Sequence, residues 1–264
     1  MIDTHAHLHP CFRLEAFLDG AADHFRRAAE GNGLPAGATG CLLVADCEGR
    51  DSFSRWGGGG IDRSCRAWAS APTGEAVSVL ARREDGARIA LVAGGQVATR
   101  EKVEVLVFGI REKPPAGESA ERTVERALDA EALVVLPWGF GKWWGRRGRV
   151  IRRLLRSADP SRLFLGDVAN RLSGKTEPLI LREARRLGFR VLPGTDPFPF
   201  RSQERHAGRY GLILDGAPDP ERPFASIRER LVRDGADFRV YGRRDRLVPF
   251  FVKQTAMQIR KVRR

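Results

Sequence analysis

The chain opens with a short alternating run, Ile2-Asp3-Thr4-His5-Ala6-His7, which restricts the fold more than any other segment. Side chains two residues apart project from the same face of a β-strand, so Asp3, His5 and His7 all point one way. Two imidazoles at positions i and i+2 stand about 7 Å apart by Cα and can chelate one divalent ion. The apolar start and the helical pattern that follows predict a buried strand with His5 and His7 as metal ligands at its C-terminal end. The alternative is a pair of structural histidines.

From residue 119 onward, short apolar strands alternate with helical patterns, which is typical of right-handed βαβ units and a parallel sheet. The predicted strands are 2–7, 41–45, 132–137, 163–165, 190–192 and 211–214, and the predicted helices are 12–30, 119–130, 148–157, 176–187 and 223–233. The middle of the chain differs, because 75–83 and 87–93 form one predicted hairpin and 96–99 forms another with 103–108. This antiparallel block interrupts the alternation.

Composition limits the classes of function. With 42% apolar residues, a chain of 264 residues can bury a sizeable core, and no apolar run is long enough to cross a membrane. The start lacks a signal-peptide pattern and the four cysteines lack a CxxC pairing, so a cytoplasmic protein with reduced thiols is expected. The net charge of +13 favours an anionic partner, either a small phosphorylated substrate or, less strongly, nucleic acid. The charge is diffuse, and only residues 258–264 form a dense basic tail.

A glycine-rich, cationic and aromatic segment, residues 139–148, lies between a predicted strand and a predicted helix. It lacks the Gly-x4-Gly-Lys-Ser/Thr pattern of a Walker loop. Backbone amides and basic side chains at a helix start suit a phosphate group, and tryptophans can stack on a base or sugar. The predicted substrate-binding residues are Lys142, Trp143, Arg146 and Arg147, with Arg201 from a neighbouring loop. The alternative is that the tryptophans cover the mouth of the fold and the arginines are solvated.

These features resemble the PHP (polymerase and histidinol phosphatase) domains and the TatD-type deoxyribonucleases, two groups of amidohydrolase-type barrels that open with an HxH motif. The segment 192–197, Leu-Pro-Gly-Thr-Asp-Pro, resembles a late barrel strand whose aspartate, here Asp196, is a metal ligand in both families. The segment 95–99, followed by 103–106, resembles the PHP region in which a strand glutamate bridges metals, and Gln96 stands at that position.

The resemblance implies an α/β fold in which residues 1–264 form a single distorted TIM-like (β/α) barrel. The barrel would have about seven strands, would be locally antiparallel near 75–108, and would carry its active site at the C-terminal ends of its strands. In that fold His5, His7 and Asp196 would meet at one mouth.

Departures from the family pattern reduce the expected metal centre. The chain has no histidine between His24 and His206, and Trp138 stands where a strand-end histidine is typical. Gln96 offers a neutral carbonyl oxygen, which bridges two cations less well than a carboxylate does. The resemblance therefore implies one ion rather than a trinuclear centre. The candidate ligands are His5, His7, Gln96 and Asp196, with Asp167 or Glu104 as additions.

The predicted function is a metal-dependent hydrolase that uses a metal-activated water to cleave a phosphoester or another anionic small substrate. Asp167 follows the strand before that of Asp196, and it is predicted to assist as ligand or general base, with a helix cap as the structural alternative. Histidine combined with carboxylate suits zinc, manganese or iron. Two other functions stay open: a TatD-like nuclease, and a catalytically reduced barrel that binds a ligand or partner.

Overall fold

The computed structural model describes residues 1–47, 49–57, 65–174, 176–232, 237–245 and 255, so the basic tail at 258–264 lies outside the described residues. The strands are β1 (Ile2–Ala6), β2 (Gly40–Val44), β3 (Trp68–Pro72), β4 (Ser78–Arg83), β5 (Arg88–Val92), β6 (Gly94–Ala98), β7 (Glu104–Phe108), β8 (Leu133–Pro137), β9 (Leu163–Val168), β10 (Val191–Gly194), β11 (Tyr210–Leu214) and β12 (Phe238–Gly242). The helices are α1 (Leu14–Gly31), α2 (Ser52–Gly57), α3 (Ala120–Asp129), α4 (Arg146–Ser157), α5 (Leu179–Arg186) and α6 (Pro223–Val232), with a 3-10 turn at Arg201–Gln203.

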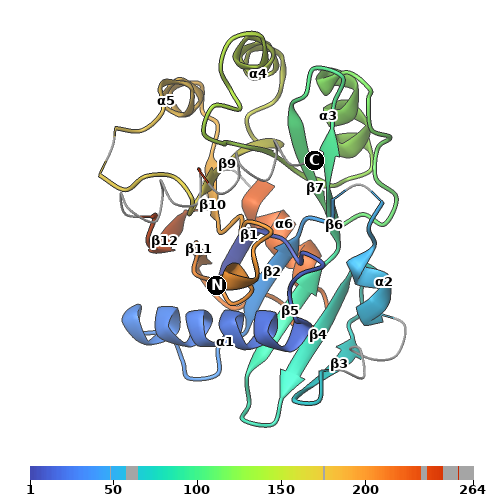
Figure 1. Ribbon diagram of the computed structural model, residues 1–264, viewed down its shortest axis with the longest axis vertical. Coiled ribbons are helices and arrows are strands. Elements are labelled where there is room, and N and C mark those ends of the chain that lie inside the picture. Colours follow the sequence, from blue (N-terminus) through green and yellow to red (C-terminus); the bar gives the residue numbers. More distant parts are fainter. Residues whose placement is uncertain (48, 58–64, 175, 233–236, 246–254, 256–264) are drawn as a thin grey trace.

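The strands form two mixed sheets, and the predicted TIM-like barrel is wrong. One sheet has seven strands in the order β12-β11-β1-β2-β5-β4-β3, and the other has five in the order β10-β9-β8-β7-β6. A TIM barrel needs a closed ring of parallel strands. Here β1 runs antiparallel to β11, and β4 pairs antiparallel with both β3 and β5. Within the described part of the chain, neither sheet closes on itself (Figure 1).

The block at 75–108 accounts for this difference. It forms two hairpins, but β4 and β5 belong to the seven-stranded sheet while β6 and β7 belong to the five-stranded sheet. The chain changes sheets between Val92 and Gly94. A Cβ at Gly94 would lie 2.3 Å from a ring carbon of Phe108, so only glycine fits at this crossing. The two hairpins therefore belong to different sheets and do not form one continuous sheet.

Helices cover the two sheets on separate faces (Figure 1). Apolar residues of α1 pack on the seven-stranded sheet, with Phe17, Leu18 and Phe25 buried against Leu42. Those of α3, α4 and α5, at the top of Figure 1, pack on the five-stranded sheet. A third apolar cluster joins the inner faces of both sheets to α6, whose contribution includes Ile227. Because side chains alternate along each strand, each sheet presents apolar residues both to its covering helices and to the inner cluster.

The two sheets meet where β1 lies beside β10. The Asp3 carboxylate accepts backbone N–H bonds from His5 at 3.1 Å, Thr195 at 2.8 Å and Gly208 at 2.8 Å. Asp3 is fully buried, so it ties three backbone segments together where water cannot replace it. Gly194 permits the close approach, because a Cβ there would lie 2.5 Å from His5 Cβ.

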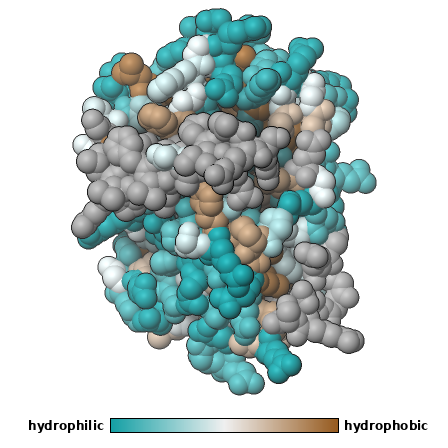
Figure 2. Space-filling view, viewed as in Figure 1, coloured by the Kyte–Doolittle hydropathy of each residue, from teal (hydrophilic) through white to brown (hydrophobic). Residues whose placement is uncertain are grey.

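The described helices include none that is both long enough and apolar enough to cross a membrane. Figure 2 shows hydrophilic residues covering much of the upper and lower parts of this face of the molecule.

We expect Asp3→Ala to lower the free energy of unfolding by about 3 kcal/mol or more, because three buried N–H groups lose their acceptor at about 1–3 kcal/mol each. Urea denaturation measures the change. The matched control is Asp129→Ala on the exposed end of α3, which should change stability by no more than about 0.5 kcal/mol. Equal stabilities of the two variants would contradict the assigned role of Asp3.

Candidate functional site

His5 near the end of strand β1 and His7 just after it have rings that face the same point. His5 Nε2 and His7 Nε2 lie 3.0 Å apart, and both residues are buried. His7 Nδ1 lies 2.5 Å from the carbonyl oxygen of Ala45, so this nitrogen donates its proton and leaves a lone pair on Nε2. The alternation expected for this strand thus places both rings on one face, as the sequence indicates.

Asp196 brings a carboxylate to the same point from the residues after β10. Its Oδ1 lies 3.7 Å from His5 Nε2 and 3.6 Å from His7 Nε2. Its backbone has φ of +47°, a left-handed conformation that is uncommon outside glycine. Two hydrogen bonds hold it there: the Asp196 N–H donates to His5 O at 2.7 Å, and Asn170 Nδ2 donates to Asp196 O. Strain of this kind is typical of residues positioned for function.

These three side chains are the group of described His, Cys, Asp and Glu residues whose ligand atoms could hold an ion, and the atoms lie within 4.8 Å of one another. In a tetrahedral zinc site with bonds of about 2.0–2.1 Å, neighbouring ligand atoms stand about 3.3 Å apart. The observed separations of 3.0, 3.6 and 3.7 Å bracket that value. Ala45 O, which accepts from His7 Nδ1, gives His7 the outer hydrogen bond usual for a ligating histidine. His5 Nδ1 is buried without such a partner among the described residues.

Burial keeps the imidazoles neutral, which a metal ligand requires. Burial, reinforced by the charge of Lys142, lowers the pKa of His5 to about 3. Burial, reinforced by the neighbouring His5, lowers the pKa of His7 to about 4 although Asp196 opposes it. Both rings therefore offer lone pairs at neutral pH.

A cation lies beside this group. Lys142, from the loop after β8, places its Nζ 2.5 Å from Glu104 Oε2 on β7. Burial disfavours its charged form, but Glu104 and then Asp196 hold the pKa of Lys142 above its ordinary value. Gln96 lies on the neighbouring strand β6, half-buried, and its N–H donates to Asp46 O at the end of β2. The site thus combines a neutral imidazole pair, one carboxylate and one fixed ammonium.

Asp167 does not join this group. It lies on β9, and its carboxylate accepts from Arg171 at 2.7 Å, from Arg244 at 2.6 Å and from Tyr210 Oη at 2.9 Å. Burial opposes ionisation, but Arg171 and Arg244 hold its pKa below the ordinary value. A carboxylate so saturated with donors is part of an ion-pair cluster, and the structure gives it no contact with the histidines.

The segment 139–148 divides among three environments. Lys142 lies beside the histidine group. Trp143 is buried in the core beneath α4, a position that favours a role in packing over the predicted contact with substrate. Arg146 and Arg147 line a separate cavity on the outer side of the fold. Arg201 is exposed and begins the 3-10 turn.

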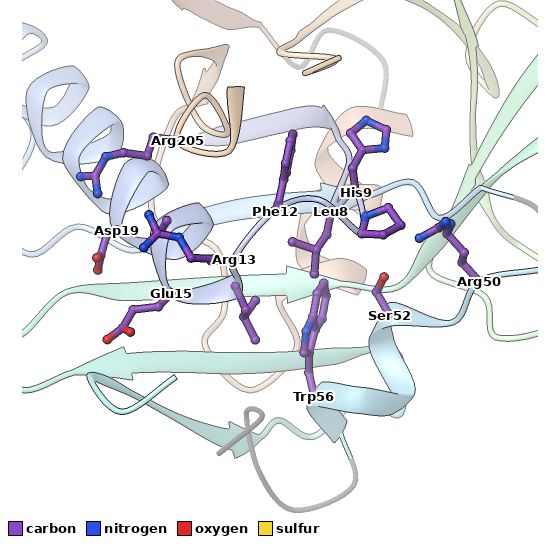
Figure 3. Close-up of a pocket in the computed structure, with 13 residues that line it drawn as sticks. Leu8, His9, Phe12, Arg13, Glu15, Asp19, Arg50, Ser52, Trp56 and Arg205 are labelled. Atoms are coloured by element: carbon purple, nitrogen blue, oxygen red, sulfur yellow. The ribbon is translucent and has the colours of Figure 1, made fainter. Parts of the chain in front are cut away.

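A cavity of about 690 Å³ adjoins the histidine group through His9 (Figure 3). The His9 ring stacks on His7 with centroids 5.2 Å apart, and its Nε2 lies 2.8 Å from Pro197 O. Figure 3 shows His9 and Arg50 at one side of the cavity, with Trp56 on α2 below them. These lining residues are not among the site residues predicted from the sequence. The alternation of β1 places His9 on the ligand face, but Pro10 obscured that signal.

No known protein family matches the sequence, and no curated protein matches it either. Its fold is similar to the crystal structure of PsfC from Pseudomonas syringae PB-5123, with a TM-score of 0.57 over 99% of this chain and 98% of that chain. The two sequences are 14% identical, so the likeness shows the fold alone. None of these comparisons bears on the resemblance to PHP and TatD proteins, which stays a prediction.

The low pKa values predict a loss of stability in mild acid. The unfolded chain protonates these histidines below about pH 6.5, whereas native His5 and His7 stay neutral down to a pKa of about 3 and about 4. The free energy of unfolding of the metal-free protein therefore falls as pH decreases from about 6.5 to 4, by up to about 1.4 kcal/mol per pH unit for each histidine.

Urea denaturation in chelator at about pH 7, 6 and 5 measures this dependence. The His7→Gln variant removes one of the two groups and should show a shallower slope. Identical slopes for wild type and His7→Gln would contradict the neutral, buried state of His7.

Proposed function

We propose that the protein is a metal-dependent hydrolase acting on a phosphoester or another anionic small substrate. The convergence of His5 Nε2, His7 Nε2 and Asp196 Oδ1 within 3.7 Å carries this proposal. Two neutral imidazoles and one carboxylate suit a single zinc, manganese or iron ion, and three protein ligands are typical of a catalytic site with an open position. Gln96 remains a candidate for an additional neutral oxygen ligand.

A bound divalent cation would polarise a phosphoryl oxygen and lower the pKa of an attacking water toward about 7. The protein itself supplies the rest. Lys142, held by Glu104, attracts the substrate anion and stays protonated through the reaction. His9 and Arg50 line the adjoining cavity, where the remainder of a substrate would lie. Asp167 is not assigned a catalytic role, because its oxygens are occupied by arginines and Tyr210.

Metal binding is the first test. Isothermal titration of chelator-treated protein with zinc or manganese should give one ion per chain. His5→Ala/His7→Ala removes two of the three ligands. Loss of a residue that only hydrogen-bonds to a ligand lowers metal affinity by up to about 100-fold, so the double variant should lose more than this.

The matched control is His24→Ala, since His24 bonds to Arg205 O on the outer side of α1 and lies outside the group. It should bind like wild type. Less than one equivalent of metal in the wild type, unchanged in the double variant, would contradict the hydrolase proposal and favour the ligand-binding alternative.

Lys142 is expected to act on substrate affinity. With p-nitrophenyl phosphate as the probe, Lys142→Gln should raise KM about ten- to hundredfold, since it removes a charge-assisted contact worth about 1.5–3 kcal/mol. The exposed Arg27→Gln on α1 is the control and should leave KM unchanged. An unchanged KM in Lys142→Gln would contradict its assigned role. A panel with a phosphodiester and single-stranded DNA separates the phosphoesterase from the TatD-like alternative.

A further inference from the structure

The outer side of α4 carries a predominantly basic surface, whose two hollows also contain Glu101 and Glu183. Its 12 residues contain six arginines and no acidic residue. Its first turn borders a cavity of about 730 Å³ that is also lined by Arg100 and Lys102 from the turn between β6 and β7. A second hollow of about 560 Å³ continues between α4 and α5, lined by Arg152, Arg156 and Arg182 among others. This surface is at the top of Figure 1, and Figure 2 shows predominantly hydrophilic residues there.

Much of this charge is not compensated by the carboxylates in the described part of the chain. Arg100, Arg152 and Arg153 pair with glutamates at 3.6, 2.8 and 3.4 Å. In contrast, Lys102 and Arg149 form no ion pair with any carboxylate that the structure describes, and neither does Arg146. Cations in the first turn of a helix are also unfavourable for the helix dipole. The folded protein therefore gathers positive charge here at a cost that an external anion would offset.

The extent of the surface favours a repeating anion. A helix of 12 residues is about 18 Å long, which exceeds the size of one phosphate group several times. Guanidinium groups bind phosphate oxygens in a planar, bidentate geometry. A row of arginines along α4 thus matches a chain of phosphates better than one small phosphorylated molecule.

Two exposed aromatic side chains adjoin this basic row. Trp144 is 68% exposed and Phe140 is 52% exposed, and their ring centroids lie 5.5 Å apart. Both belong to the loop that leads into α4, and their neighbour Trp143 is buried in the core. Large aromatic rings are costly to leave in water, and beside a basic track they provide a surface on which unpaired bases stack.

We propose that this surface binds single-stranded nucleic acid, with the phosphate backbone on Lys102, Arg146 and Arg149 and with bases stacked on Trp144 and Phe140. The binding needs no metal ion and does not depend on the proposed hydrolase activity. Acidic proteins and anionic membranes offer negative charge but no bases for the aromatic pair. Duplex DNA keeps its bases stacked internally and uses only the cationic half of the surface.

The test measures fluorescence anisotropy of a labelled oligothymidylate of about 12 nucleotides, within the usual site size for single strands, with the full chain in chelator. Lys102→Gln/Arg146→Gln/Arg149→Gln should reduce affinity and lower the slope of log affinity against log salt by about 2, since each phosphate contact contributes about 0.7. The control Arg27→Gln/Arg82→Gln/Arg88→Gln removes equal charge from exposed positions on α1 and on the β4–β5 hairpin, and it should retain the wild-type slope.

Trp144→Ala should weaken single-strand binding about tenfold, the loss of one stacked base, while binding to a duplex of equal length stays unchanged. His5→Ala/His7→Ala should bind the oligonucleotide like wild type, which separates this surface from the metal site. Equal losses in the two triple variants would overturn the proposal. So would equal losses on single strand and duplex for Trp144→Ala, or binding to phosphatidylserine vesicles with none to the oligonucleotide.

Discussion

The buried carboxylate of Asp3 is the interaction on which the rest of the structure depends. It accepts N–H bonds from β1 itself, from the residue after β10 and from the turn before β11, so one side chain fixes three segments that are distant in the sequence. Burial raises the pKa of Asp3, and these hydrogen bonds oppose that shift by stabilising the charged form. Because β1 and β10 are held side by side, the two histidines of one and the aspartate that follows the other reach a common point.

Some residues of the candidate site could be predicted from local sequence patterns, and others could not. The alternation of the first strand places His5 and His7 on one face, and this depends only on neighbouring residues. Asp196 follows from resemblance to a motif, and the structure brings it to the histidines. The different positions of Lys142 at the site and Trp143 in the core could not be predicted from the sequence. Side chains in an irregular loop have no regular spacing, so tertiary packing decides which of them is buried. Asp167, like Asp196, lies near the C-terminal end of a predicted strand, but Arg171 and Arg244 bind its carboxylate. Arg171 is only four residues away in the sequence, whereas the contact with Arg244 depends on tertiary structure that no local pattern predicts.

The fold shows the same division. The helices and most strands follow from hydrophobic periodicity, and the hairpins at 75–108 follow from their turn residues. Whether the two hairpins lie in one sheet or in two depends on whether β6 pairs with β5 or joins another sheet. Hydrophobic periodicity and turn residues do not specify that choice, so a barrel was predicted where two open sheets form.

The position of β1 in the middle of the seven-stranded sheet has a consequence for how the molecule is made. It pairs with β2, which follows soon after in the sequence, but also with β11, which is synthesised much later. Ile2 pairs with Leu212, and contacts of such long sequence separation are slow to form. His5 and His7 are synthesised long before Asp196, so a nascent chain would expose the two imidazoles to metal ions before the carboxylate that completes the group exists.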